Sequence, residues 1–313
     1  KLGKEDGIPD GNLGRIGLAF SASQPSRVYA LIEATKNGLY KSDDGGFKWE
    51  LVNSDPAYVT TRSFYFQDIR VDPNNENRIY SLYQPIAMSE DAGKSFRVIA
   101  PMNKIHADHH AMWISPNDPS FILEGGDGGL SISHDRGKTW KFEEQLAFGQ
   151  FYHINVDNEL PYHVMGGLQD NGSWRGPAYQ WIEGPIQNMA WQDVSGGDGF
   201  DVAPDPDDAN WVYSMSQGGE LSKYNIATGE RARIKPPAPD LQTRLRFNWN
   251  AALATDPLDA KTIYYGSQFL HKSTNKGLTW EIISPDLTTN NKAQQKQDDN
   301  GGLSIDITGA ENY

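Results

Sequence analysis

Apolar and polar residues alternate along most of the chain in short runs that turn residues interrupt. The segments INVDNELPYHVMGG (154–167) and FDVAPDPDDANWVYSM (200–215) show the arrangement: an alternating apolar run, a turn rich in Pro, Asp or Asn, and a second run rich in β-branched and aromatic residues. A Gly-rich turn and a third run follow. Alternation with a period of two is typical of strands that bury one face, so these runs predict β-strands joined by tight turns.

The third run ends in a recurring motif, Ser/Thr-x-Asp-x-Gly-x-x-aromatic. It occurs at residues 42–49, 89–96, 133–140 and 273–280, and in the last copy Asn275 replaces the Asp. The first three copies begin 47 and 44 residues apart, and the fourth begins 140 residues after the third, which is about three periods. We therefore expect two degenerate copies between them, with Ser173 and Ser222 in register.

Repeats of this length with four short strands each predict the blades of a β-propeller. The chain is therefore predicted to be all-β, with six blades at approximately 14–56, 64–101, 108–146, 150–184, 197–236 and 249–286. A polar connector is expected at 287–300 and the start of a further blade at 301–313. Because a stray strand leaves sheet edges unpaired, we expect these 313 residues to be part of a longer protein. Further blades would come from the rest of that chain or from a partner chain.

The motif itself predicts a turn between the third and fourth strands of a blade. Its Ser and Asp side chains are expected to bond backbone amides, its Gly to take a positive φ, and its aromatic residue to pack between sheets. The residues with this structural role are Ser42, Asp44, Gly46, Trp49, Ser89, Asp91, Gly93, Phe96, Ser133, Asp135, Gly137, Trp140, Ser273, Gly277 and Trp280.

Composition narrows the classes of partner and chemistry. Nine Trp, 14 Tyr, 12 Phe and 31 Gly favour an interior of rings and turns over Leu-rich helices. The net charge of −13 and the lack of basic runs argue against nucleic acid and anionic lipid as partners. The absence of Cys excludes disulfides, thiolate zinc sites and thiol nucleophiles. No apolar stretch reaches the roughly 18 residues of a transmembrane segment, and motifs of serine hydrolases, NTPases, zincins and dinucleotide-binding proteins are missing.

Strand alternation brings the second-to-third-strand turns and the connections between blades to one edge of the sheets. Three aspartates fall in Gly-rich segments of that set: Asp127 in GGDGG, Asp170 in QDNG and Asp198 in GGDG. Glycine lets a ligand approach the backbone, so these carboxylates are candidate catalytic acids or acceptors for sugar hydroxyls. For each one taken singly, an ordinary Asx-turn is the alternative interpretation.

The segment HADHH is the other unusual feature of this edge. His106, Asp108, His109 and His110 are candidate ligand-binding residues, and His106 with Asp108 is a candidate site for a divalent metal ion. His109 and His110 should point to opposite sides of a strand, so at most one of them joins the others. The alternative is a hydrogen-bonded loop that braces the edge.

Polar and aromatic residues of the same segments complete the candidate binding residues. Rings there are expected to stack on sugars or clamp a peptide, with core packing as the alternative. These residues are Gln169, Asn171, Trp191, Trp249, Phe64 and Tyr65.

The segments GRIGLAFS, HADHHAMWISP, GGDGGLSIS and QDNGSW resemble bacterial Asp-box (BNR-like) β-propellers of the sortilin-type and glycosyl-hydrolase-like group. The resemblance implies an exported protein that is secreted, periplasmic or on the outer cell surface of a bacterium. Members of that group include xyloglucan-cleaving hydrolases with paired catalytic aspartates and receptors that bind peptides.

Two functions from different classes follow. The first is a binding propeller that holds a glycan, a peptide or a partner protein at its rim and central channel, without a required cofactor. The second is a glycoside hydrolase in which two carboxylates among Asp127, Asp170 and Asp198 flank a glycosidic bond. A metal-dependent hydrolase around His106 and Asp108 is a third interpretation, and it would need a bound divalent ion.

Overall fold

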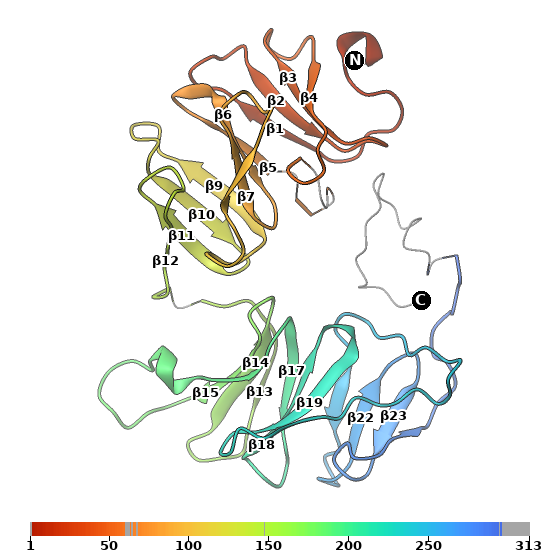
Figure 1. The fold of residues 1–313 in the computed structure, drawn as a ribbon. Coiled ribbons are helices and arrows are strands. Elements are labelled where there is room, and N and C mark those ends of the chain that lie inside the picture. The colour runs from red at the N-terminus through yellow and green to blue at the C-terminus, as the bar shows by residue number, and fades with distance from the viewer. Residues whose placement is uncertain are drawn as a thin grey trace. The chain divides into compact units, whose positions relative to one another are not determined.

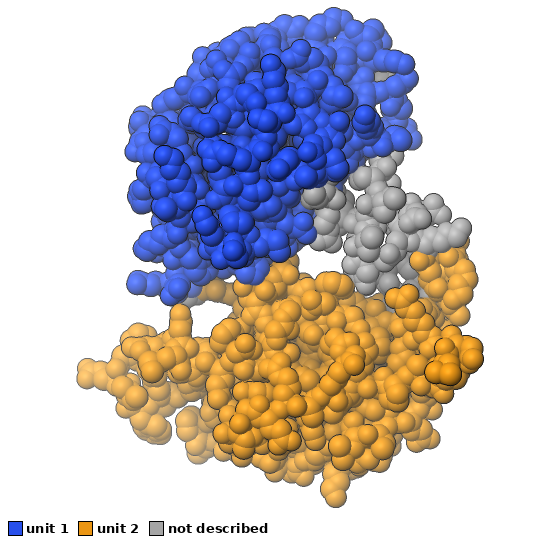
Figure 2. All heavy atoms as spheres, in the orientation of Figure 1, with its two compact units in different colours: residues 1–146, 298–306 blue, residues 147–297, 307–313 orange. Residues whose placement is uncertain are grey.

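The computed structural model describes residues 2–59, 63, 65–66, 68–146, 148–293 and 295. The candidate residue Phe64, most of the expected connector after residue 293 and the expected start of a further blade at 301–313 lie outside the described residues. The chain divides into two compact units, with the boundary between Leu146 and residue 147, which Figure 2 shows in separate colours.

The first unit contains three antiparallel sheets of four strands each, after a short 3-10 helix, η1 (Lys4–Asp6). The first sheet consists of β1 (Ile16–Phe20), β2 (Val28–Ile32), β3 (Gly38–Ser42) and β4 (Glu50–Asn53). The second consists of β5 (Asp68–Asp72), β6 (Asn75–Leu82), β7 (Ile86–Ser89) and β8 (Arg97–Ala100). The third consists of β9 (His109–Ile114), β10 (Ile122–Gly126), β11 (Gly129–Ser133) and β12 (Lys141–Phe142).

The second unit contains three further sheets of the same kind (Figure 1). The fourth sheet consists of β13 (Phe151–Val156), β14 (His163–Leu168), β15 (Ser173–Pro177) and β16 (Gln192–Ser195). The fifth consists of β17 (Gly199–Pro204), β18 (Trp211–Ser216), β19 (Glu220–Asn225) and β20 (Arg231–Arg233). The sixth consists of β21 (Leu253–Thr255), β22 (Ile263–Gly266), β23 (Leu270–Ser273) and β24 (Glu281–Ile282), and the 3-10 turns η2 (Asn188–Ala190) and η3 (Gln217–Gly219) lie in connections.

In every sheet the strands pair in sequence order, so each strand is hydrogen-bonded to the one before it. The described residues thus form six four-stranded blades, which confirms the prediction of an all-β chain with this blade structure. One strand differs from the expected bounds: β16 lies beyond residue 184, where the fourth blade was expected to end. The fourth strand of this blade is Gln192–Ser195, so the connection to the next blade begins after Ser195 and not after residue 184.

The core of each unit lies between neighbouring sheets. Four tyrosines of the second strands are almost completely buried: Tyr29, Tyr80, Tyr213 and Tyr265. The hydroxyl of Tyr29 donates to Glu76 O at 2.7 Å and that of Tyr213 to Asp205 Oδ2 at 2.9 Å. Burial of each ring stabilises the fold by roughly 1.5–3 kcal/mol. Aromatic residues therefore contribute to the interior, which consists mostly of Ile, Val, Leu, Ala and Met side chains.

The four repeated turns share one hydrogen-bond pattern. The Ser Oγ accepts from the Gly N–H four residues on, at 2.9 Å for Ser42 and 2.8 Å for Ser89, Ser133 and Ser273. Asp44, Asp91 and Asp135 accept from the N–H four residues on at 2.8–3.0 Å, and Asn275 does the same at 2.9 Å. Two consecutive residues have positive φ in each turn, for example Arg136 at 61° and Gly137 at 78°.

The turn glycines in three of the repeats also press against the preceding sheet. A Cβ at Gly93 would lie 2.5 Å from Leu39 Cδ2, one at Gly137 2.6 Å from Ile99 Cδ1, and one at Gly277 2.7 Å from Ile234 Cδ1. Trp140 packs on the cluster between the second and third sheets, and Trp280 Nε1 donates to Ile234 O at 2.8 Å. The turns therefore hold neighbouring sheets together.

The two degenerate copies are not in the expected register. Ser173 is the first residue of β15 and Ser222 lies inside β19, whereas Ser42 and its counterparts are the last residues of their third strands. In the fifth sheet Asn225 ends the third strand, and its Oδ1 accepts from Ala227 N and Thr228 N at 3.0 Å. The alignment of these two copies was wrong, because β15 continues four residues beyond Ser173, to Pro177, and β19 continues three residues beyond Ser222, to Asn225.

Candidate functional site

The candidate residues of the first unit lie where the connection before β9 meets the β10–β11 turn. The N–H of Asp108 donates to Gln84 O at 3.2 Å and that of His109 to Tyr83 O at 2.9 Å, so the HADHH segment crosses the β6–β7 turn of the second sheet. The N–H of Asp127 then donates to Asp108 O at 3.1 Å. These backbone bonds bring Asp108 and Asp127 together from segments 19 residues apart in the sequence.

Glycine is required on both sides of Asp127 for this approach. A Cβ at Gly126 would lie 2.7 Å from Asp108 O, and one at Gly128 would lie 2.2 Å from the Cβ of His106. No side chain fits at either distance without displacing the loop. The GGDGG sequence thus serves the close contact between two segments, as expected for backbone that approaches a neighbour.

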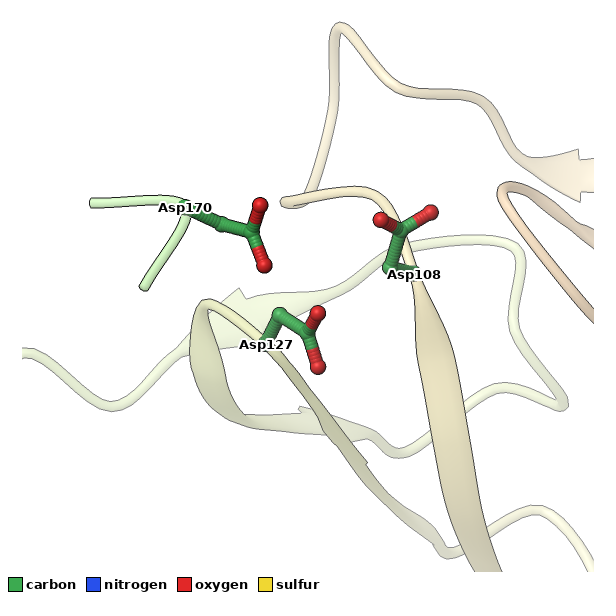
Figure 3. A group of neighbouring side chains, drawn as sticks. All are labelled: Asp108, Asp127 and Asp170. Carbon is green, nitrogen blue, oxygen red and sulfur yellow. The ribbon is translucent and has the colours of Figure 1, made fainter. Parts of the chain in front are cut away.

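The Asp127 carboxylate accepts a hydrogen bond from one side chain and lies close to a second. Tyr65 donates its hydroxyl to Oδ2 at 3.1 Å, and Nε2 of His110 lies 3.2 Å from Oδ1. His110 stacks on Phe66 with ring centroids 5.3 Å apart and meets the edge of Tyr65 at 4.7 Å. Carboxylate oxygens of Asp108 and Asp127 lie within 4.8 Å of each other, and Figure 3 shows both side chains. Asp170, also drawn there, belongs to the second unit and is described with it.

His109 points away from this cluster, as strand alternation predicts for neighbours on β9. Its side chain is 1% exposed, and its Nδ1 lies 2.5 Å from Oε1 of the equally buried Glu124. His109 therefore contacts Glu124 of the neighbouring strand and does not face a ligand. Such a buried pair supports the pairing of β9 with β10. Sequence reasoning missed Glu124, although a carboxylate at an inward position of the apolar strand ILEGG was a usable signal.

His106 and Asp108 remain a hypothetical metal pair. Nδ1 of His106 lies 2.9 Å from Ala107 O, its own neighbour's carbonyl. Within the described residues of either unit taken alone, no three His, Asp or Glu side chains bring a ligand atom each to within 4.8 Å of one another.

In the second unit, the β14–β15 turn is tied to the connection after β16. The N–H of Asp170 donates to Asp198 Oδ1 at 2.7 Å, and the N–H of Gly172 donates to Gly197 O at 2.8 Å. Asp170 has a φ of 57°, a left-handed conformation that Asp tolerates better than most residues. The structure thus brings two of the three candidate aspartates, Asp170 and Asp198, together within one unit.

Asp198 is a buried acceptor. It is 6% exposed, and Trp249 Nε1 donates to its Oδ2 at 2.8 Å. Burial raises the pKa of Asp198, and the charge of Asp170 raises it further, whereas the hydrogen bonds from Asp170 N–H and Trp249 lower it. A carboxyl with a raised pKa beside a second carboxyl is the arrangement used for general acid catalysis.

The remaining candidates of this turn support its backbone. Asn171 donates from Nδ2 to Gln169 O at 2.8 Å, and Trp174 donates to Asn171 O at 2.7 Å. Gln217 was missed by sequence reasoning. Its Oε1 accepts from Asp198 N–H at 2.8 Å, and its position in the SQGG turn of the same edge was the available signal.

A second carboxylate with a perturbed pKa lies near this cluster in the sequence. Burial raises the pKa of Asp201, opposed by the charge of His153 and a hydrogen bond from the N–H of Leu253. Nδ1 of His153 lies 3.8 Å from Asp201 Oδ1, and its Nε2 lies 2.8 Å from Asn250 Nδ2. The amide donates to Nε2, so the ring proton faces Asp201. Neither residue was a candidate from the sequence.

Trp191 does not lie at the expected edge. It ends the connection between β15 and β16, a third-to-fourth-strand connection, and so it lies at the opposite edge of its sheet from Asp170. Its ring packs over Gly176, where a Cβ would lie 2.4 Å from Trp191 Cδ2. The interpretation of Trp191 as a platform beside the aspartates was wrong because β16 begins one residue later.

No protein-family model and no curated protein matches this chain. Among the described residues, no helix is long and apolar enough to cross a membrane. Solved structures similar to the chain include the GH74 xyloglucanase from Xanthomonas campestris, with 17% identity over 86% of this chain and 45% of that one and a TM-score of 0.32. The GH74 enzyme from Niastella koreensis is 17% identical; the match covers 85% of this chain and 44% of that enzyme, with a TM-score of 0.32.

Another similar structure is YCF48 bound to a D1 peptide, with 17% identity over 87% of this chain and 83% of that one and a TM-score of 0.32. The chain spans less than half the length of the two GH74 enzymes. Identities of 17% and TM-scores of 0.32 do not distinguish an enzyme from a binding protein.

Proposed function

We propose that this protein binds a peptide or protein ligand through the cluster of Asp108, Asp127, His110 and Tyr65. The observation that supports the proposal most directly is the pair of carboxylates within 4.8 Å, one of which accepts a hydrogen bond from a tyrosine hydroxyl and lies 3.2 Å from an imidazole nitrogen. Two carboxylates at this separation suit a cationic group such as a Lys ammonium, an Arg guanidinium or an amino terminus. The rings of Tyr65, Phe66 and His110 supply an aromatic surface beside the charge.

The net charge of −13 acts in the same direction, because an acidic protein attracts a basic ligand before contact. We further propose that the protein is exported and works outside the bacterial cytoplasm, which follows from the sequence resemblance alone. Fractionation of the source cells with an antibody against the protein tests that location.

The binding proposal is tested with a short peptide, Ac-Gly-Lys-Tyr-Lys-Gly-amide, and the same peptide with acetylated lysines. We expect calorimetric titration to give an affinity at least tenfold higher for the charged peptide, and a decrease with added salt. Asp127→Asn and Asp108→Asn should each weaken binding about tenfold, since each removes one charge with little change of shape. Asp118→Asn is the matched control, because Asp118 lies in the β9–β10 turn at the other edge of the same sheet.

Equal affinity for both peptides, or equal weakening by Asp118→Asn, would contradict the proposal. The titration is repeated after treatment with a chelator, and binding should persist. Loss of binding that added Mg²⁺ or Zn²⁺ restores would instead favour the metal interpretation of Asp108 and His106.

A glycoside hydrolase is the second candidate function, and the Asp170–Asp198 pair favours it. Asp198, with its raised pKa, would act as the acid and Asp170 as the second carboxylate. Xyloglucan and other polysaccharides are incubated with the protein, and the release of reducing ends is measured. Release that is abolished in Asp198→Asn and in Asp170→Asn would establish this activity. Peptide binding without any release would leave the first proposal standing.

A further inference from the structure

The connection between β15 and β16 is twice as long as its counterparts. It contains 14 residues, 178–191, whereas four of the other third-to-fourth-strand connections contain seven and the one between β19 and β20 contains five. Figure 1 shows this segment, in light green, extending beyond its sheet. It takes the place of the repeated turn found in four of the other sheets, and the five-residue connection of the fifth sheet shows that a blade is completed without so long a segment.

Large apolar side chains on this segment are unusually exposed. Trp181 is 83% exposed, Ile182 76% and Met189 88%. The β13–β14 turn lies beside this segment, because the N–H of Ala178 donates a hydrogen bond to Tyr162 O at 3.1 Å. Leu160 in that turn is 97% exposed. We call the set formed by Leu160, Tyr162, Tyr179, Trp181, Ile182 and Met189 the 178–191 patch. Exposed apolar groups of this size are typical of surfaces that become buried in a complex.

The segment is braced, although its side chains are exposed. Gln180 Nε2 donates to Pro185 O at 2.7 Å across the loop, and Trp191 anchors its end against Gly176. Tyr179 and Trp181 meet edge to face with centroids 5.0 Å apart. A braced loop loses less conformational freedom on binding than a disordered one, which favours recognition.

The charge and the side chains of the 178–191 patch indicate what kind of partner it would bind. Segments 158–162 and 178–191 contain two acidic residues, Glu159 and Glu183, and no Lys or Arg. An anionic membrane is disfavoured because it attracts basic segments. A second copy of this chain is disfavoured because both copies would present the same acidic patch and a net charge of −13. The exposed Ile and Met side chains also differ from the flat aromatic platform that would stack on a sugar ring.

We propose that the 178–191 patch is a docking site for a partner protein that presents an apolar pocket bordered by Lys or Arg. Trp181 and Met189 fill the pocket, since Trp and Met are enriched in the buried centres of protein interfaces. Glu159 and Glu183 pair with the basic border. This site lies at the opposite edge of the fourth sheet from the Asp170 turn, so it is distinct from the Asp170–Asp198 pair. None of its residues belongs to the proposed peptide-binding cluster.

The test uses a phage library of random 12-residue peptides, selected on the wild-type protein and depleted on Trp181→Ala. We expect recovered peptides to combine apolar residues with Lys or Arg. Synthetic versions should bind at least tenfold more weakly to Trp181→Ala and to Met189→Ala, and more weakly to the wild type at high salt. Leu278→Ala is the matched control, since Leu278 is 70% exposed in the equivalent connection of the sixth sheet. Circular dichroism and thermal unfolding verify that the variants are folded.

Three results would overturn the proposal. The first is a selection whose peptides bind Trp181→Ala or Met189→Ala as well as the wild type. The second is sedimentation of the wild type, and not of Trp181→Ala, with phosphatidylcholine vesicles, which would identify a membrane contact. The third is a dimer in analytical ultracentrifugation that Trp181→Ala abolishes, which would identify a second copy as the occupant.

Discussion

The indole of Trp249 donates a hydrogen bond of 2.8 Å to Oδ2 of Asp198, a residue 51 positions earlier in the chain. The bond joins the connection before β21 to the connection before β17. Asp198 receives a second hydrogen bond from the N–H of Asp170, so its carboxylate links three segments of the second unit. Such a buried acceptor orients its surroundings, and its removal should affect both stability and any chemistry of Asp170.

Trp249→Phe keeps the ring and removes the donor. We expect it to lower the free energy of unfolding by about 1–3 kcal/mol at pH 7, because the buried carboxylate loses a partner. The hydrogen bond lowers the pKa of Asp198, so its loss raises that pKa further above the ordinary value of an aspartate, 3.8. A carboxyl whose pKa is raised in the folded state favours folding at low pH, and this contribution is lost as the pH rises through the pKa of the folded state. The deficit of the variant should therefore shrink as Asp198 becomes protonated.

Urea unfolding of this variant between pH 3 and 7 measures the effect. Trp181→Phe serves as the control, because Trp181 is exposed and its replacement should change stability by no more than about 0.5 kcal/mol. A deficit of the same size at every pH would show that packing, and not the hydrogen bond, carries the effect.

Tyr65→Phe tests the orientation of Asp127. The variant retains the ring contacts with Phe66 and His110 but loses the hydroxyl that donates to Asp127. If the proposed cluster binds the charged peptide, its affinity should fall about two- to tenfold, as expected for loss of one hydrogen bond. Calorimetric titration gives the affinity, and thermal unfolding shows whether the fold is affected. Unchanged affinity would mean that the hydroxyl does not position the carboxylate for binding.

Asp135→Ala tests the repeated turn. The Thr139 hydroxyl, followed by the Thr139 N–H, lowers the pKa of Asp135 to about 2. Because this pKa is lower in the folded chain than in the unfolded chain, where it is near 3.8, the ionised Asp135 stabilises the fold at pH values above 3.8. This stabilisation is lost as the pH falls through the pKa of the folded chain. We expect a melting temperature lower by about 2–4 °C at pH 7, as for loss of a capping side chain, and a smaller difference near pH 2.

Asp135→Asn is the informative companion, because Asn275 occupies the same position in the fourth turn. There the Oδ1 accepts from Thr279 N–H, while Nδ2 donates to Thr279 Oγ1 at 2.8 Å. The Asn variant should therefore keep most of the stability at pH 7. A loss as large as that of Asp135→Ala would contradict this account.

Gly137→Ala tests the contact between the turn and the preceding sheet. The backbone there has a φ of 78°, and the new Cβ would meet Ile99 Cδ1 at 2.6 Å. Gly45→Ala is the matched control, because its φ is 82° and no atom lies within 4 Å of the new Cβ. The control should cost about 1–2 kcal/mol from backbone strain. Gly137→Ala should cost about 1–3 kcal/mol more from overpacking, and equal unfolding energies would disprove the contact.

Much of the fold could be predicted because its determinants are local. Alternation identifies strands from a few neighbouring residues, and the Ser-x-Asp-x-Gly turns close their hydrogen bonds within four residues. The copies that lack this turn were the ones placed out of register, since nothing local marks the end of β15 or β19. Because the end of β15 carries no local signal, Trp191 was also predicted at the wrong edge of its sheet.

The sequence by itself determined the all-β class, the six four-stranded blades and the edge at which Asp127, Asp170 and Asp198 would be found. Only the tertiary structure decided which of these residues meet and what they contact. Tyr65 reaches Asp127 across 62 positions, Trp249 reaches Asp198 across 51, and His109 is buried against Glu124. The physical reason is that alternation gives each strand its inward and outward faces, whereas a side chain's partner depends on how separate sheets pack.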